Sequence, residues 1–143
     1  MSDEDIKKIL DDGKVERVAA DEDLARAEIE NAKAHLESAV VLIDSDPVMA
    51  YTALYDASRK AVAAHMRALG FRVVGKKGHH AKTMEYAEAA LDSHGINEHI
   101  ERLDEMRVIR NDTEYRGRVV GRAEIEADLE TARKIVAAVE KEI

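Results

Sequence analysis

The residue types best suited to chemistry lie in one short segment, RVIRNDTEYR, at positions 107–116. An apolar stripe at helical spacing leads into it, formed by Ile96, Ile100, Leu103 and Met106. Arg110 takes the next place in that stripe, where the spacing calls for an apolar residue. An arginine offers a planar set of donors that stays charged at ordinary pH, so the segment favours a phosphate or other anion site. The structural alternative is that Arg110 pairs with Glu114, one turn on, and stabilises the end of the helix.

A second segment, residues 71–80, carries Arg72 and then four basic or titratable side chains close together: Lys76, Lys77, His79 and His80. Its glycines and its break in the helical spacing predict a surface loop. The loop leads into the first turn of a helix, where backbone N–H groups favour an anion, so one interpretation is a phosphate-contacting loop. The other interpretation is that the lysines form a solvated face and that His80 packs one turn before Met84.

Several kinds of catalytic or metal site find no support in the sequence. The chain has no cysteine, which excludes disulfides, thiolate zinc sites, iron–sulfur clusters and cysteine nucleophiles. Its six histidines form neither an HExxH motif nor the ExxH pairs of di-iron bundles, and its serines lack a nucleophile-elbow context. We therefore expect no metal ion and no cofactor.

The composition is that of a helical protein. The chain has 143 residues, of which 45% are hydrophobic, 3% aromatic and 36% charged. Helices use this mixture and β-sheets do not, so an all-β fold is excluded and an all-α fold is expected. A chain of this length is expected to build one hydrophobic core.

Start and stop signals divide the chain into predicted helices. Asp21 suits the N-cap of a long helix, Asp46–Pro47 begins another, and Gly70 ends it. The predicted helices cover residues 21–43, 47–69, 84–91, 97–115 and 125–143. We predict an antiparallel up-and-down bundle of four long helices plus short helices over residues 21–143. Residues 1–20 are expected to form a short N-terminal helix or arm.

The formal net charge of −8 is unevenly distributed. Residues 1–46 hold 14 acidic and 6 basic residues, whereas the two signs balance over residues 47–143. Bulk attraction of nucleic acid is therefore not expected, although local basic segments remain at 70–82 and 107–122. The acidic start differs from a signal peptide, and no apolar run reaches the roughly 18–20 residues of a membrane span. We expect a cytoplasmic protein without a membrane partner.

Three stretches carry a resemblance to a known family: AYTALYDASRKA at 50–61, GHHA at 78–81 and MRVIRNDTEY at 106–115. With these stretches in this order, residues 13–143 resemble the HEPN family (higher eukaryotes and prokaryotes nucleotide-binding domain), and more narrowly an actinobacterial-type branch. The resemblance implies a helical bundle and a homodimer. It also implies RNA as a ligand and a cognate antitoxin or nucleotidyltransferase as a partner, because family members are frequent in toxin–antitoxin and other defence systems.

The family's catalytic motif is an arginine, a polar residue, a variable stretch and a histidine. On this chain Arg110 matches the arginine, Asn111 matches the polar residue, and Tyr115 stands where the histidine usually lies. A phenol with a pKa of about 10 can donate a proton at neutral pH but is a poor base. The resemblance thus implies a catalytic set of Arg110, Asn111 and Tyr115. His79 or His80 would replace the missing base if the loop folds over this segment. The expected substrate-binding set is Lys76, Lys77, His79, His80 and Glu114.

Two functions follow from these observations. The first is a dimeric, HEPN-like, RNA-associated protein of the toxin–antitoxin or defence type. Whether it is also a metal-independent endoribonuclease stays open at this point. The second is a catalytically inactive HEPN-like dimer that acts as a protein interaction or nucleotide-binding module.

Overall fold

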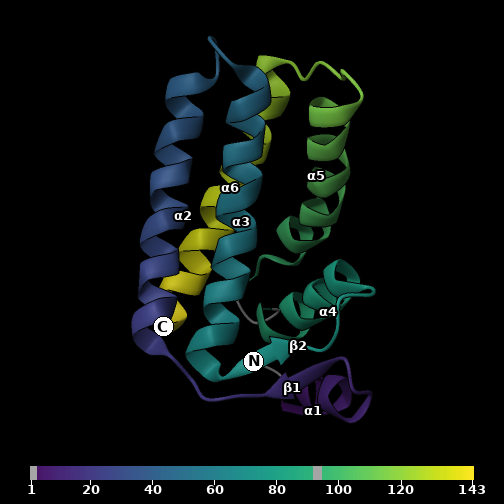
Figure 1. The fold of residues 1–143 in the computed structure, drawn as a ribbon. Coiled ribbons are helices and arrows are strands. Elements are labelled where there is room, and N and C mark those ends of the chain that lie inside the picture. The colour runs from purple at the N-terminus through teal and green to yellow at the C-terminus, as the bar shows by residue number, and fades with distance from the viewer. Residues whose placement is uncertain (1–2, 92–94) are drawn as a thin grey trace.

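The computed structural model describes residues 3–91 and 95–143, and this part of the chain is mostly helical (Figure 1). Four long helices pack antiparallel: α2 (Glu22–Leu42), α3 (Pro47–Leu69), α5 (Asn97–Tyr115) and α6 (Arg122–Glu142). Two shorter helices, α1 (Asp3–Asp11) and α4 (His79–Leu91), lie at one end of the long ones. The prediction of an antiparallel helical bundle is confirmed. Within the described ranges, no helix has the length and apolar character needed to cross a membrane.

Local sequence signals set where α2 and α3 begin and where α3 ends. Asp21 and Asp46 each accept a hydrogen bond from the amide three residues on, at 3.0 and 3.2 Å. Pro47 occupies the first turn of α3, where its missing N–H has no cost. Gly70 ends α3 at a φ of 80°, a left-handed conformation that glycine adopts without strain. These predicted boundaries are confirmed.

The segment between α3 and α4 differs from its prediction as a surface loop over residues 71–80. Phe71–Val73 form strand β2, and α4 already begins at His79. Strand β2 pairs antiparallel with β1 (Val15–Arg17), and its three residues alternate buried, exposed, buried. That alternation is typical of a half-buried strand, which explains why this segment pairs instead of looping out. The pairing attaches the N-terminal segment to the end of α3.

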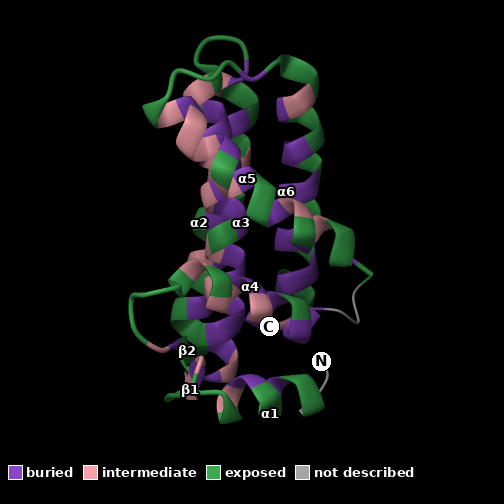
Figure 2. Ribbon diagram, turned by 90° about the vertical axis from the view of Figure 1, so that its right-hand side faces the viewer, coloured by how far each residue is buried: buried purple, intermediate pink, exposed green. Residues whose placement is uncertain are grey.

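Helix α3 lies at the centre of the bundle and packs against α2, α5 and α6 (Figure 1). Figure 2 shows that buried residues run along most of its length. Fully buried alanines occur on both α2 and α3, among them Ala25 and Ala32 on α2 and Ala57 and Ala61 on α3. Small side chains let helices approach closely, so α3 can be surrounded by three neighbours.

A buried hydrogen-bonded network ties α3, α5 and α6 together. Asp128 on α6 is 2% exposed, and its carboxylate accepts a hydrogen bond from the Tyr51 hydroxyl at 2.7 Å. Arg102 on α5 donates to the same carboxylate from Nε at 2.8 Å and from Nη2 at 3.0 Å. Burial and the bond to Asp128 raise the pKa of Tyr51, so the phenol keeps its proton and remains the donor. The bidentate ion pair between Arg102 and Asp128 sets the position of α5 against α6.

We expect the two sides of this pair to differ in their effect on stability. Arg102→Ala leaves the buried Asp128 carboxylate with the Tyr51 hydroxyl as its remaining partner, which should lower the free energy of unfolding by about 3 kcal/mol. Asp128→Asn keeps an acceptor for Tyr51 and lets the part-exposed Arg102 reach water, so it should cost about 1 kcal/mol. Denaturant unfolding at pH 7 measures both. A larger loss for Asp128→Asn would contradict the network described.

Replacing Gly70 by alanine tests how closely the N-terminal segment crosses the end of α3. A Cβ atom there would lie 2.6 Å from the Val18 carbonyl oxygen, at a φ of +80°. Gly117 has a similar φ of +70° but open space around it, so Gly117→Ala is the matched control for backbone strain alone. We expect about 1–2 kcal/mol lost in the control and a further 1–3 kcal/mol lost in Gly70→Ala. Equal losses in denaturant unfolding would argue against this close crossing.

Candidate functional site

The segment predicted to carry the chemistry forms the last turns of α5. The buried stripe of this helix consists of Ile100, Leu103, Met106, Ile109 and Thr113. Arg110 therefore lies beside the stripe, half-buried, and does not take an apolar place in it as the spacing predicted. The helical period explains the difference, because a step of three from Met106 falls on Ile109 and keeps the stripe apolar. Arg110 Nη1 donates to Asn111 Oδ1 at 3.2 Å, so these two predicted site residues are in contact.

Glu114 and Tyr115, the other two predicted site residues of this segment, do not contact Arg110: Glu114 bonds to α3 and Tyr115 faces outward. Glu114 accepts a hydrogen bond from the Thr52 hydroxyl at 2.9 Å, which ties the end of α5 to α3. The alternative ion pair between Arg110 and Glu114 does not form, since no described carboxylate pairs with Arg110. Tyr115 is 74% exposed at the end of α5. The charge of Arg110 is thus not neutralised by its own helix.

Three guanidinium groups act electrostatically on the buried side chain of Tyr55 on α3. Arg59, one turn on, and Arg107 and Arg110 on α5 all exert their charge on its hydroxyl. Burial raises the pKa of Tyr55, and the three cations oppose that rise. Arg59 has Asp56 at 3.7 Å, but Arg107 forms no ion pair within the described residues. Arg107 Nε and Arg110 Nε are buried and have no hydrogen-bond partner there. This cluster has more donors than acceptors, which is the chemistry of an anion site.

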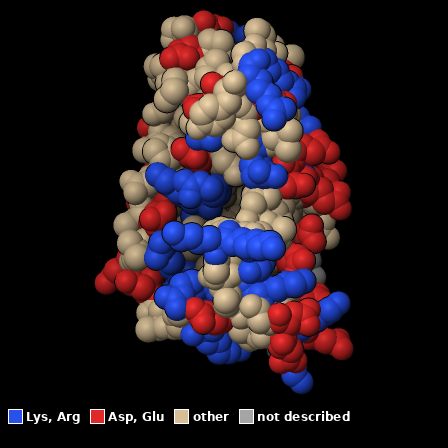
Figure 3. All heavy atoms as spheres, turned by 45° about the vertical axis from the view of Figure 1, so that its right-hand side comes forward, with Lys and Arg blue, Asp and Glu red and all other residues tan. Residues whose placement is uncertain are grey.

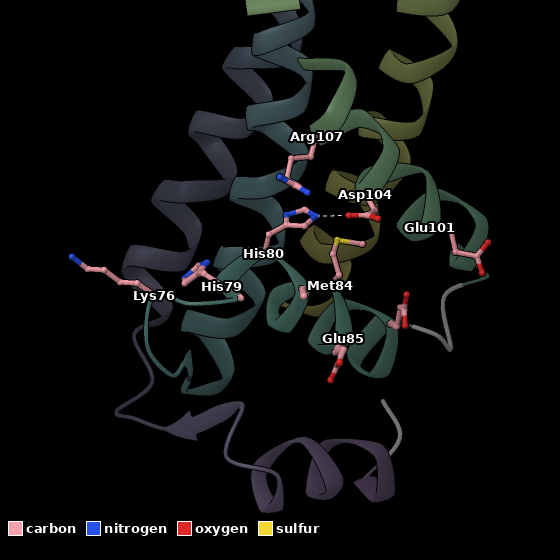
Figure 4. Close-up of a pocket in the computed structure, with 11 residues that line it drawn as sticks. Lys76, His79, His80, Met84, Glu85, Glu101, Asp104 and Arg107 are labelled. Carbon is pink, nitrogen blue, oxygen red and sulfur yellow. Dashed lines mark hydrogen bonds and ion pairs between the residues drawn. The ribbon is translucent and has the colours of Figure 1, made fainter. Parts of the chain in front are cut away.

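His80, in the first turn of α4, reaches α5 at Asp104, six residues before Arg110. Its Nε2 lies 2.7 Å from Asp104 Oδ1, and Figure 4 shows the imidazole between Asp104 and the guanidinium of Arg107. A carboxylate only accepts, so Nε2 carries the proton of this bond and the neutral ring presents Nδ1 as an acceptor. The sequence left open whether the loop histidine approaches the arginine segment. His80 bonds to Asp104 and lines two hollows together with Arg107, and neither hollow is lined by Arg110. A histidine oriented by a carboxylate beside an arginine can accept a proton near a bound anion.

Two hollows meet at these residues. The acidic hollow, about 750 Å³, is lined by Glu85, Glu88, Glu101 and Asp104 as well as Lys76. The arginine hollow, about 610 Å³, is lined by Arg59, Arg67, Arg72, Tyr55 and apolar side chains. His79, His80 and Arg107 line both, so they form the wall between them. Lys and Arg side chains gather on the face of the molecule that carries α4 and α5 (Figure 3).

The structure brings some predicted residues together and leaves others apart. His79, His80 and Lys76 share a hollow with Arg107, whereas Lys77 is exposed and lines neither hollow. Three residues of the site were not predicted from the sequence: Tyr55, Asp104 and Arg107. Helical spacing carried a signal for them, because Asp104, Arg107 and Arg110 follow each other at steps of three on α5. Tyr55 and Arg59 are likewise one turn apart on α3.

Metal ligation is not a feature of these side chains. In residues 3–91 and 95–143, no group of three or more His, Asp or Glu side chains is placed to hold a metal ion. The contacts of His80 are instead a hydrogen bond to one carboxylate and a wall shared with Arg107. Proton transfer and anion binding are the chemistry that this arrangement can perform.

No protein-family model matches this chain, and no curated protein and no solved structure shows significant similarity to it. The resemblance to the HEPN family therefore rests on the motifs at 50–61, 78–81 and 106–115. Antiparallel helical bundles serve many functions, so the fold alone does not identify one. What the site can do follows from the side chains described above.

Proposed function

We propose that this chain is a HEPN-like, RNA-associated protein of the toxin–antitoxin or defence type that acts as a dimer and cleaves RNA without a metal ion. One observation carries the proposal. His80, held by Asp104 at 2.7 Å, shares two hollows with Arg107, whose buried Nε has no partner among the described residues. This arrangement places a proton acceptor beside a phosphate-binding group.

RNA phosphates fit the charge of this face. Arg59, Arg107 and Arg110 all act electrostatically on Tyr55, and two of the three form no ion pair within the described ranges. Guanidinium groups bind phosphate oxygens through two parallel hydrogen bonds. The net charge of −8 resides in residues 1–46, and from that segment Glu16 pairs with Arg72 at this face. Arg107 and Arg110 keep their charge without a carboxylate partner among the described residues. A single strand suits the face, because its phosphates and bases are both accessible to side chains.

The cleavage step needs a base, a charge-stabilising group and an acid. His80 Nδ1 accepts the proton of a ribose 2′-hydroxyl, the 2′-oxygen forms a bond to the adjacent phosphorus, and the bond from phosphorus to the 5′-oxygen breaks. Arg107 and Arg110 stabilise the negative charge that builds on the phosphate oxygens. The products are a 2′,3′-cyclic phosphate and a 5′-hydroxyl. Protonated His80 then returns its proton to water, and the acid that protonates the 5′-oxygen regains a proton from water.

The leaving 5′-oxygen needs a proton from an acid. The family resemblance assigns Tyr115 to the catalytic set, and its phenol can donate this proton. Tyr115 follows Asp104 by eleven residues, about 16 Å along the helix axis, so its own His80 is out of reach. The partner subunit's Tyr115 supplies the proton if two copies of α5 lie side by side. The exposed position of Tyr115 supports this role, because its hydroxyl is open to a second copy.

Cleavage of labelled mixed-sequence RNA in EDTA tests this function. We expect the wild-type chain to release fragments ending in 2′,3′-cyclic phosphate. His80→Ala should slow cleavage by about 100-fold or more, and Arg107→Ala and Arg110→Ala by about 100- to 1,000-fold each. Arg133→Ala, which removes an exposed α6 arginine beside Glu130, is the matched control and should cleave as wild type does.

Unfolding curves of each variant show whether the fold is intact. Cleavage by His80→Ala at the wild-type rate would remove His80 as the base. Cleavage by Arg110→Ala at the wild-type rate would show that Arg110 is not part of the active site, contrary to the family resemblance. No cleavage by the wild type, together with a lower melting temperature or weaker dimer for Arg110→Ala, would favour the inactive interaction module instead.

A further inference from the structure

The arginine hollow combines two kinds of wall. Val18 and Leu24 line it and are 36% and 39% exposed, so their apolar surface is left uncovered at the hollow. Met66 and Phe71 are buried beneath the same surface. An apolar wall of this kind gains free energy when a ring or another apolar group covers it.

The polar wall of the arginine hollow is strongly cationic. Four arginines line it, against the single carboxylate of Asp21, which is already engaged as the N-cap of α2. Arg72 pairs with Glu16, and Arg59 has Asp56 nearby. Arg67 and Arg107 form no ion pair within the described part of the chain. Two of the four arginines, Arg67 and Arg107, are therefore left to bind an anion that enters the hollow.

We infer that the arginine hollow binds one nucleotide, with its base against the apolar wall and a phosphate on the unpaired arginines. A base offers a flat ring that covers apolar side chains and stacks on guanidinium planes, and its phosphate matches the arginine donors. A volume of about 610 Å³ lies in the usual range of small-molecule sites. An aliphatic carboxylate would cover the apolar wall but would bring a smaller negative charge to the unpaired Arg67 and Arg107.

This inference deepens the proposed function and rests on it only for RNA as the source of the nucleotide. His79, His80 and Arg107 line the same hollow, so a nucleotide seated there has its phosphate next to the proposed base. The nucleotide in the hollow is then one of the two that flank the cleaved phosphodiester. A free nucleoside monophosphate offers the same chemistry and competes for the same walls.

Calorimetric titration of the full chain with small probes tests the inference. The probes are adenosine 5′-monophosphate, uridine 5′-monophosphate, adenosine and inorganic phosphate. We expect both monophosphates to bind, and adenosine and inorganic phosphate to bind at least about tenfold more weakly, because each engages one wall only. A monophosphate that binds no more tightly than inorganic phosphate would overturn the base-binding wall.

Two variants and two matched controls locate the binding. Leu24→Ser removes exposed apolar surface, and Arg67→Gln removes an unpaired charge; each should weaken monophosphate binding at least about fivefold. Val41→Ser on α2, at a residue that is 77% exposed, and Arg133→Gln on α6 should leave binding unchanged. Wild-type affinity in both Leu24→Ser and Arg67→Gln would overturn the inference.

A third arm identifies the source of the nucleotide and separates this inference from the proposed function. A 2′-O-methyl tetranucleotide, which cannot be cleaved, should bind more tightly than a monophosphate if RNA is the ligand, and equal affinities would point to a free nucleotide. Both results support the hollow as a nucleotide site. Nucleotide binding that depends on Leu24 and Arg67 in a chain without cleavage activity would keep the inference and remove the function. RNA cleavage by the wild type, with unchanged RNA affinity in Leu24→Ser and Arg67→Gln, would keep the proposed function and overturn the nucleotide site.

Discussion

The buried carboxylate of Asp128 is the interaction on which the position of α5 depends. It accepts hydrogen bonds from Tyr51 on α3 and from two nitrogens of Arg102 on α5, and so joins three helices at one point. Helix α5 has few buried residues for its length, so apolar packing alone holds it less firmly than it holds α3. Because α5 carries Asp104, Arg107 and Arg110, the same carboxylate indirectly sets the geometry of the candidate site.

The second constraint is the crossing of the N-terminal segment over the end of α3. The Val18 amide donates to the Gly70 carbonyl oxygen at 2.9 Å, and strands β1 and β2 extend this contact. The crossing brings Val18 and Leu24 to the arginine hollow, next to residues of α3 and β2. The beginning of the chain therefore forms one wall of a site whose charged groups come from its middle.

Sequence reasoning succeeded where a signal is local and failed where it is not. Asp21, Asp46, Pro47 and Gly70 act on neighbouring backbone, so their types alone predict the helix ends. Strands of three residues, paired across more than fifty positions, leave no period in the sequence that could be detected. The bond between His80 and Asp104 spans 24 positions and depends on how α4 packs against α5. Arg110 was found from its type, but its surroundings required Tyr55 and Arg107 to be placed in space.

On one face of the molecule, arginines without ion-pair partners among the described residues lie beside a histidine that a carboxylate orients. The most direct test is NMR mapping of amide chemical shifts on adding a 2′-O-methyl oligoribonucleotide. We expect shifts at the end of α3, in β2, in the first turn of α4 and along residues 104–111 of α5, with α6 residues near Arg133 unchanged. Shifts confined to other faces, or no shifts at saturating oligonucleotide, would contradict this expectation.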